Sequence, residues 1–253
     1  MLGRIQTALG VVLLLSTPAL QAEDDEEDIR LYMQGRYVFQ RNCAVCHGRM
    51  GRGDGELAKG VTIKPRTFRK GVFKFRSTPM GKLPTDADLQ RTIRTGISGS
   101  MMPAFTALSA ADLRAVIAYI KQLSPRWDDV ALKARPVELP AVPDWFSHAE
   151  QHEKHARAGR ATFKLHCASC HGEAGEGDGS AAKGLADVWG DPIRPAKLNV
   201  AHHRSGDSPS DLFRSVALGL DGTPMVGFLA ALGEDKIWDL IAYIESLPPS
   251  QEQ

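Results

Sequence analysis

The sequence predicts an all-α protein made of two similar helical domains in tandem. A pentapeptide occurs twice in the 253-residue chain, and the residues around the two copies follow the same order. Apolar residues also recur at helical spacing near the end of each copy, namely Leu113, Val116, Ile117 and Ile120, and then Ile237, Leu240, Ile241 and Ile244. Self-similarity of this kind is typical of an internal duplication.

The repeated pentapeptide has the form Cys-x-x-Cys-His and contains all four cysteines of the chain. This is the attachment signature of c-type haem, in which two thiols bind the porphyrin covalently and the histidine ligates the iron. The sequence therefore predicts two covalently bound haem c groups. The predicted attachment residues are Cys43, Cys46 and His47 in the first copy and Cys167, Cys170 and His171 in the second.

Other uses of four cysteines have to be compared with this one. A structural zinc site brings two Cys-x-x-Cys pairs to one ion. The pairs here are 124 residues apart, and a histidine follows each of them directly. A thioredoxin-like dithiol and structural disulfides are further alternatives. One Cys-x-x-Cys-His motif can arise by chance, whereas two in matching surroundings favour haem.

The repeat extends on both sides of the pentapeptides. A Gly-Arg-x-x-Phe segment ends four residues before each first cysteine, at 35–39 and 159–163. After the histidines, glycines recur at identical spacing through 47–60 and 171–184. Glycine permits backbone angles closed to other residues and lets the chain pass close to a flat ligand. The copies then diverge by insertions and deletions, which surface loops tolerate.

We expect three main helices in each copy. They cover 29–42, 86–95 and 110–123 in the first and 148–166, 209–218 and 234–247 in the second. Thr85 and Ser208 can cap the short middle helices, and Pro209 takes the favoured first position. Pro125 and Pro248 close the last helices.

A segment with three prolines, 127–147, predicts an extended linker between the copies. We therefore expect one domain over 23–126 and another over 148–250. Residues 1–22 fit an export signal, with a short apolar core and a small-residue cleavage region. A retained membrane anchor is less favoured, because the apolar stretch is short for a bilayer.

Export agrees with the haem sites, because covalent haem attachment in bacteria takes place outside the cytoplasm. We therefore expect a periplasmic protein that contacts a membrane only if the N-terminal segment is retained. The six consecutive acidic residues at 23–28 predict a solvated, mobile start of the mature chain.

The charge is balanced, with 31 basic and 30 acidic residues, which argues against nucleic-acid binding. However, the segment from Lys59 to Lys82 holds eight basic residues and no acidic one. Two interpretations stay open for this basic segment. It is either an ordinary solvated loop or a docking surface for an acidic redox partner, since charge complementarity speeds encounter.

Each iron needs an axial ligand besides its histidine. Met225 aligns with Met102, and these residues follow their histidines by 54 and 55 residues. The register favours Met102 over Met101. Methionine gives a six-coordinate iron of raised potential that suits electron transfer. Three other methionines lack counterparts, and we expect them to be packing residues: Met33, Met50 and Met80.

Two prolines, Pro65 and Pro195, are candidates to support the histidine ligands. Their carbonyls could accept the Nδ1–H of the imidazole, a bond that fixes the ring and tunes its basicity. Plain turn prolines are the alternative. Six more histidines could replace methionine in a rearranged state, although solvated side chains are the favoured interpretation: His148, His152, His155, His166, His202 and His203.

Together these residues resemble class I cytochromes c, twice over. The resemblance covers nearly all of 29–124 and 150–248. It depends on the haem motif, the glycine loop and Met-Pro-Ala-Phe before a final helix. The second copy departs from the pattern with Pro-Met-Val around Met225. The resemblance implies that first and last helices cross at a glycine and aromatic residues, here Gly35, Phe39 and Tyr119, and Gly159, Phe163 and Tyr243.

The resemblance implies a periplasmic di-haem electron carrier, or an electron-transfer subunit of a redox complex, with redox proteins as donor and acceptor. The alternative is a di-haem enzyme such as a cytochrome c peroxidase. An enzyme needs one haem with a labile or absent distal ligand beside acid–base groups, whereas both copies offer a methionine. We therefore expect no catalytic residues. We expect unequal potentials, because the copies differ in their loops.

Overall fold

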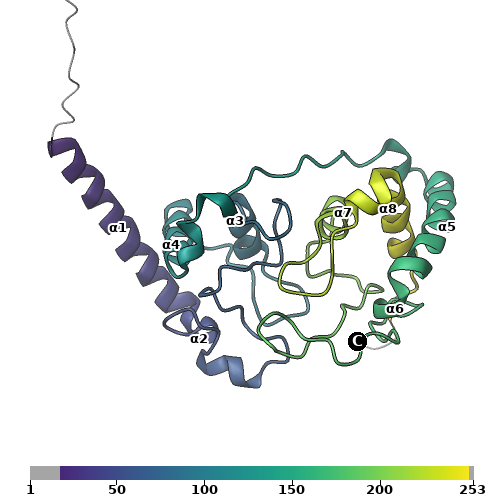
Figure 1. Cartoon of the computed structure of the whole chain (residues 1–253), viewed down its shortest axis with the longest axis horizontal. Coiled ribbons are helices and arrows are strands. Elements are labelled where there is room, and N and C mark those ends of the chain that lie inside the picture. Colours follow the sequence, from purple (N-terminus) through teal and green to yellow (C-terminus); the bar gives the residue numbers. More distant parts are fainter. Residues whose placement is uncertain (1–17, 251–253) are drawn as a thin grey trace, which may run out of the picture.

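The computed structural model describes residues 18–250 and is helical, with two similar halves joined by a long connection (Figure 1). The first half contains α1 Pro18–Asn42, α2 Ala44–His47, α3 Asp86–Thr95 and α4 Ala110–Gln122. The second contains α5 Ala149–His166, α6 Ala168–His171, α7 Pro209–Leu218 and α8 Leu229–Glu245. Short 3₁₀ turns lie at Glu56–Gly60, Pro125–Trp127, Val130–Leu132 and Asp144–Ser147. Within residues 18–250 no strand forms, so the predicted all-α class is confirmed.

The short middle helices have the predicted bounds because their capping residues act as expected. The Thr85 hydroxyl accepts a hydrogen bond from the Asp88 amide, and the Ser208 hydroxyl accepts one from the Asp211 amide, each at 3.1 Å. Helix α8 begins five residues before the predicted start, because a helical turn precedes a kink at Gly233, where φ is 74°. Glycine adopts this positive φ without strain.

Helix α1 begins at Pro18 and is longer than predicted. It includes the acidic residues 23–28, so this segment is helical, and residues 25–28 are exposed as expected of a solvated start. Ala, Leu, Gln and Glu in this stretch are strong helix formers, and the first part of α1 projects from the body of the molecule (Figure 1). Residues 1–17, which hold most of the predicted export signal, lie outside the described residues. Over residues 18–250, no helix combines the length and apolarity needed to cross a membrane.

Each half has its own apolar core where its first and last long helices cross. Helix α1 packs on α4, and α5 packs on α8. The Phe39 and Tyr119 rings lie 5.2 Å apart between centroids, and those of Phe163 and Tyr243 lie 5.1 Å apart. These crossings are the ones that the resemblance implied.

The crossings have no room for a side chain at Gly35. A Cβ atom there would lie 2.0 Å from the Ala115 carbonyl oxygen. We expect Gly35→Ala to destabilise the haem-loaded protein by about 1–3 kcal/mol or more, the usual cost of overpacking a rigid core. Chemical denaturation followed by helical circular dichroism measures this change. Gly60→Ala is the matched control, because no atom lies within 4 Å of its added Cβ. Equal stability of the two variants would show that the crossing is not tight.

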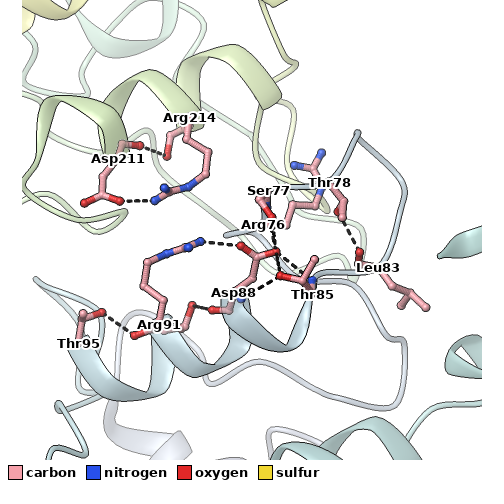
Figure 2. Close-up of polar contacts among 12 residues, drawn as sticks. Arg76, Ser77, Thr78, Leu83, Thr85, Asp88, Arg91, Thr95, Asp211 and Arg214 are labelled. Carbon is pink, nitrogen blue, oxygen red and sulfur yellow. Dashed lines mark hydrogen bonds and ion pairs between the residues drawn. The ribbon is translucent and has the colours of Figure 1, made fainter. Parts of the chain in front are cut away.

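The start of α3 is tied to the preceding loop by the buried carboxylate of Asp88 (Figure 2). One carboxylate oxygen accepts hydrogen bonds from the amides and hydroxyls of Ser77 and Thr85, at 2.8–2.9 Å. Arg91 donates to the other oxygen at 2.7 Å. Burial alone raises the pKa of Asp88, but these donors outweigh it and hold the pKa below its usual value. Asp88 is therefore ionised at neutral pH and fixes the loop.

The proline-containing segment 127–147 is an extended connection attached to both halves. The amide of Leu83 donates to the Leu132 carbonyl at 2.9 Å, and the amide of Val137 donates to the Ser77 carbonyl at 2.8 Å. Further along, the Trp145 ring stacks on the ring of His155 in α5, with 3.7 Å between the centroids, and so attaches the connection to the second half. The exact domain boundaries within this segment stay a prediction.

Candidate functional site

The two pentapeptides have the same local structure. Each starts at the end of a long helix and continues as a single short turn, α2 or α6. The amide of Cys43 donates to the Phe39 carbonyl at 2.8 Å, and that of Cys167 donates to the Phe163 carbonyl at 2.8 Å. The core aromatic residue of each crossing therefore sets the position of the first cysteine.

The four thiols are free and half-buried. Burial, with a smaller contribution from the neighbouring cysteine, raises the pKa of Cys43 to about 12 and that of Cys167 to about 11. Neutral thiols are weak nucleophiles and weak metal ligands, unlike the thiolates of redox-active pairs. In the described part of the chain, no three His, Cys, Asp or Glu side chains converge on a metal position. The raised pKa values of Cys43 and Cys167 and the lack of a converging ligand cluster in the described residues disfavour the dithiol and zinc alternatives.

Both histidines of the pentapeptides are oriented by a backbone carbonyl. His47 Nδ1 lies 2.9 Å from the carbonyl oxygen of Arg66, and His171 Nδ1 lies 2.9 Å from that of Ala196. Burial lowers the pKa of each imidazole, although the carbonyl partly offsets this effect. Each ring is therefore neutral and donates its Nδ1–H. The lone pair of Nε2 remains for an iron ion.

The predicted carbonyl acceptors, Pro65 and Pro195, are wrong by one residue. Their carbonyls face the glycine loops instead, since a Cβ atom on Gly53 or Gly177 would lie 2.6 Å from them. Successive carbonyls of an extended chain point in opposite directions, so the next residue faces the histidine. The acceptors Arg66 and Ala196 share no side-chain chemistry, so no signal in the sequence identified them. Contact of the two prolines with the cofactor stays a prediction.

Met102 and Met225 occupy equivalent loops. The amide of Ile97 donates to the Met102 carbonyl and the amide of Leu220 donates to the Met225 carbonyl, both at 3.0 Å. Both methionine side chains are half-buried against the core of their own half. Met101 is instead 65% exposed, which supports the preference for Met102. Met33 and Met50 are each 54% exposed, so the expectation that they are packing residues is wrong for them. Met80 does pack, because its terminal methyl group lies against Gly219 of the second half.

The structure gives the basic segment from Lys59 to Lys82 a role that neither interpretation included. Several of its side chains contact the second half of the chain. The Arg66 guanidinium lies 3.9 Å from the ring centroid of Trp189 and 3.8 Å from the carboxylate of Asp187. Arg76 is buried against Asp221. The segment is thus partly an interface between the halves, and docking of a partner on its exposed cations, such as Lys59, Lys64 and Arg69, stays a prediction.

Around the half-buried Lys74 this interface gathers two further half-buried cations, Arg66 and Arg204, and one half-buried anion, Asp187. Burial lowers the pKa of Arg66 to about 10 and that of Lys74 to about 8, and it also lowers the pKa of Arg204. Arg66 and Arg204 further lower the pKa of Lys74, while Asp187 opposes them. Buried charge is costly unless it is paired. The excess of positive charge fits a cofactor that brings carboxylates, as haem does. The thiols, imidazoles and thioethers of the two sites are also the groups that attach and ligate a haem.

The comparisons with known proteins agree with this geometry. A family model described as cytochrome c oxidase, cbb3-type, subunit III matches residues 30–120. A second model, cytochrome c, matches residues 156–248. The matches fall on the two halves and leave the proline-containing connection between them.

Two relatives extend over both halves. The cbb3-type cytochrome c oxidase subunit FixP of Azorhizobium caulinodans is 29% identical over 188 residues, which are 70% of this chain and 51% of FixP. The chain thus spans about half the length of this curated relative. A solved chain of the reducing HAO-like protein complex of Kuenenia stuttgartiensis is 34% identical with a TM-score of 0.78, over 85% of this chain and 96% of that one. The chain therefore belongs to the c-type cytochromes, as a di-haem member whose two tandem cytochrome c domains imply two covalently bound haem c groups.

Proposed function

We propose that this protein is a periplasmic di-haem electron carrier that serves as an electron-transfer subunit of a redox complex. The observation that carries the proposal is the matched construction of the two sites. Each combines a neutral histidine fixed by a carbonyl with a methionine held in an equivalent loop. His47 and Met102 would be the axial ligands in the first domain, and His171 and Met225 in the second.

When bound, each haem supplies a one-electron ferric/ferrous couple. The chain's own residues keep the ligands in place. The carbonyl bonds prevent rotation of the imidazoles, and Phe68 stacks on the His47 ring at 4.6 Å between centroids. A fixed pair of axial ligands allows a change of oxidation state without ligand exchange. This property suits a carrier and leaves no open position for a substrate.

The relatives support a place in a redox complex. FixP is described as a subunit of a cbb3-type oxidase, and the solved relative is part of a protein complex. We propose by analogy that this chain exchanges electrons with protein partners in a complex of its own. The periplasmic assignment rests on the predicted export signal at residues 1–22 and on haem attachment outside the cytoplasm.

Ligand binding and spectroscopy of the haem-loaded protein test this proposal. We expect neither ferrous haem to bind carbon monoxide rapidly, because methionine occupies each sixth position. The near-infrared Met–iron band should be halved in Met102→Ala and in Met225→Ala. Each variant should also open one haem to carbon monoxide. Rapid binding at one haem of the unmodified protein would instead support the peroxidase alternative.

A further inference from the structure

The loop that carries Met225 also carries a buried acid, Asp221. The Leu220 amide donates to the Met225 carbonyl at 3.0 Å, so Asp221 lies inside a closed backbone loop. The Thr223 amide donates to the Leu220 carbonyl at 3.1 Å and completes the turn. The position of the Asp221 carboxylate is therefore linked through a few bonds to the position of Met225.

The partners of Asp221 come from the first domain. Arg76 Nε donates to one carboxylate oxygen and Arg76 Nη2 to the other, each at 2.9 Å. The amide of Gly81, also in the first domain, donates to both oxygens at 3.1 Å. Arg76 is 2% exposed and Asp221 is 7% exposed, so water does not screen the pair.

Arg76 also reaches the backbone at the start of the loop. Its Nη2 donates to the Leu218 carbonyl at 3.0 Å and its Nη1 to the Gly219 carbonyl at 3.4 Å. Figure 2 shows the Arg76 guanidinium pointing away from α3. One side chain of the first domain thus contacts the end of α7 and the acid of the Met225 loop.

Among residues 18–250, no arginine–carboxylate pair like that of Arg76 and Asp221 supports the Met102 loop. The residue aligned with Asp221 in the first copy is Ser98, which lacks a carboxylate and cannot pair with an arginine. Both loops share an internal hydroxyl bond, from Ser100 to the Ile97 carbonyl and from Thr223 to the Leu220 carbonyl, each at 2.7 Å, so the contact with Arg76 is what sets the second loop apart. The two methionine loops are therefore alike in their backbone and different in their external support.

A buried ion pair contributes little net stability, since apolar side chains of similar volume often replace it without loss. Its two-pronged geometry, however, fixes the relative orientation of the groups it joins. We propose that Arg76 is a positioning residue for Met225, through which docking of the first domain holds the sixth ligand of the second haem. The proposal rests on the proposed role of Met225 as an iron ligand.

Three variants of the haem-loaded protein test the proposal. Arg76→Lys keeps the positive charge but loses the paired hydrogen bonds that the guanidinium donates to the two oxygens of Asp221. The double variant Arg76→Met/Asp221→Asn removes the ion pair of Arg76 and Asp221 without leaving an unpaired buried charge, so it avoids the main reason for misfolding. Arg91→Lys is the matched control, because Arg91 lies beside a small cavity between the domains and pairs with Asp88 of its own helix. A redox titration measures the potentials of both haems in each variant, and the near-infrared Met–iron band is recorded.

We expect the double variant to lose the Met225 contribution to the band and to lower the potential of the second haem alone. Arg76→Lys should show a partial loss, and Arg91→Lys should show none. Unchanged band and potentials in the double variant, or equal changes at both haems, would overturn the proposal. If Met225→His leaves the band of the otherwise unmodified protein intact, the assignment of Met225 as a ligand fails. That result is distinct from a failure of Arg76.

Discussion

Protein that lacks both haems will be largely unfolded. A domain of about 100 residues buries a limited fraction of its surface, so its apolar core alone gives marginal stability. Here each half has one apolar core cluster at a helix crossing, and a bound porphyrin would supply further apolar surface for the helices to pack on. The variant with alanine at Cys43, Cys46, Cys167 and Cys170 provides the haem-free chain. Far-ultraviolet circular dichroism and a thermal melt measure its helix content and cooperativity.

Variants that lose only one of the two haems test the same prediction for each domain separately. Cys43→Ala/Cys46→Ala should lose the helical signal of the first domain while the second haem remains attached. The pair Cys167→Ala/Cys170→Ala should do the converse. A cooperative melt of a strongly helical haem-free chain would show that the protein core suffices and that haem is not needed for folding.

Histidine in place of either methionine ligand will lower the potential of one haem and leave the other nearly unchanged. Methionine raises the potential of a haem relative to bis-histidine ligation, and axial ligands set potentials over a range of roughly 0.8 V. We therefore expect Met102→His and Met225→His each to shift one titration step by a sizeable part of that range. A redox titration of the haem-loaded protein measures both steps.

The neighbouring methionine provides the control for this prediction. Met101→His changes an exposed side chain one residue from the proposed ligand and should leave both steps in place. A shift in Met101→His with none in Met102→His would reverse the assignment in the first domain. The unmodified protein should itself show two steps, because the loops around its haems differ.

Local sequence features were sufficient for most of the fold. Helical periodicity and the capping residues Thr85 and Ser208 predicted α3 and α7 to the residue. The repeated spacing paired Met102 with Met225, and the equivalent hydrogen bonds of their loops agree with that pairing. These features are predictable because periodicity and capping act within a few residues along the chain.

The histidine acceptors and the role of the basic segment could not be predicted in this way. The carbonyls of Arg66 and Ala196 face the histidines because of the direction of the backbone, which leaves no trace in residue type. The basic segment appeared free for a partner because its acids, Asp187 and Asp221, lie in the other copy.

The sequence by itself determined that this protein has two cytochrome c domains, each with an attachment motif and a methionine in register. Only the tertiary structure decided how the domains meet. Arg76 and Asp221 are 145 residues apart, and their pairing depends on the docking of two folded surfaces. Contacts of this kind depend on shape and charge across an interface, which no local pattern of residues encodes.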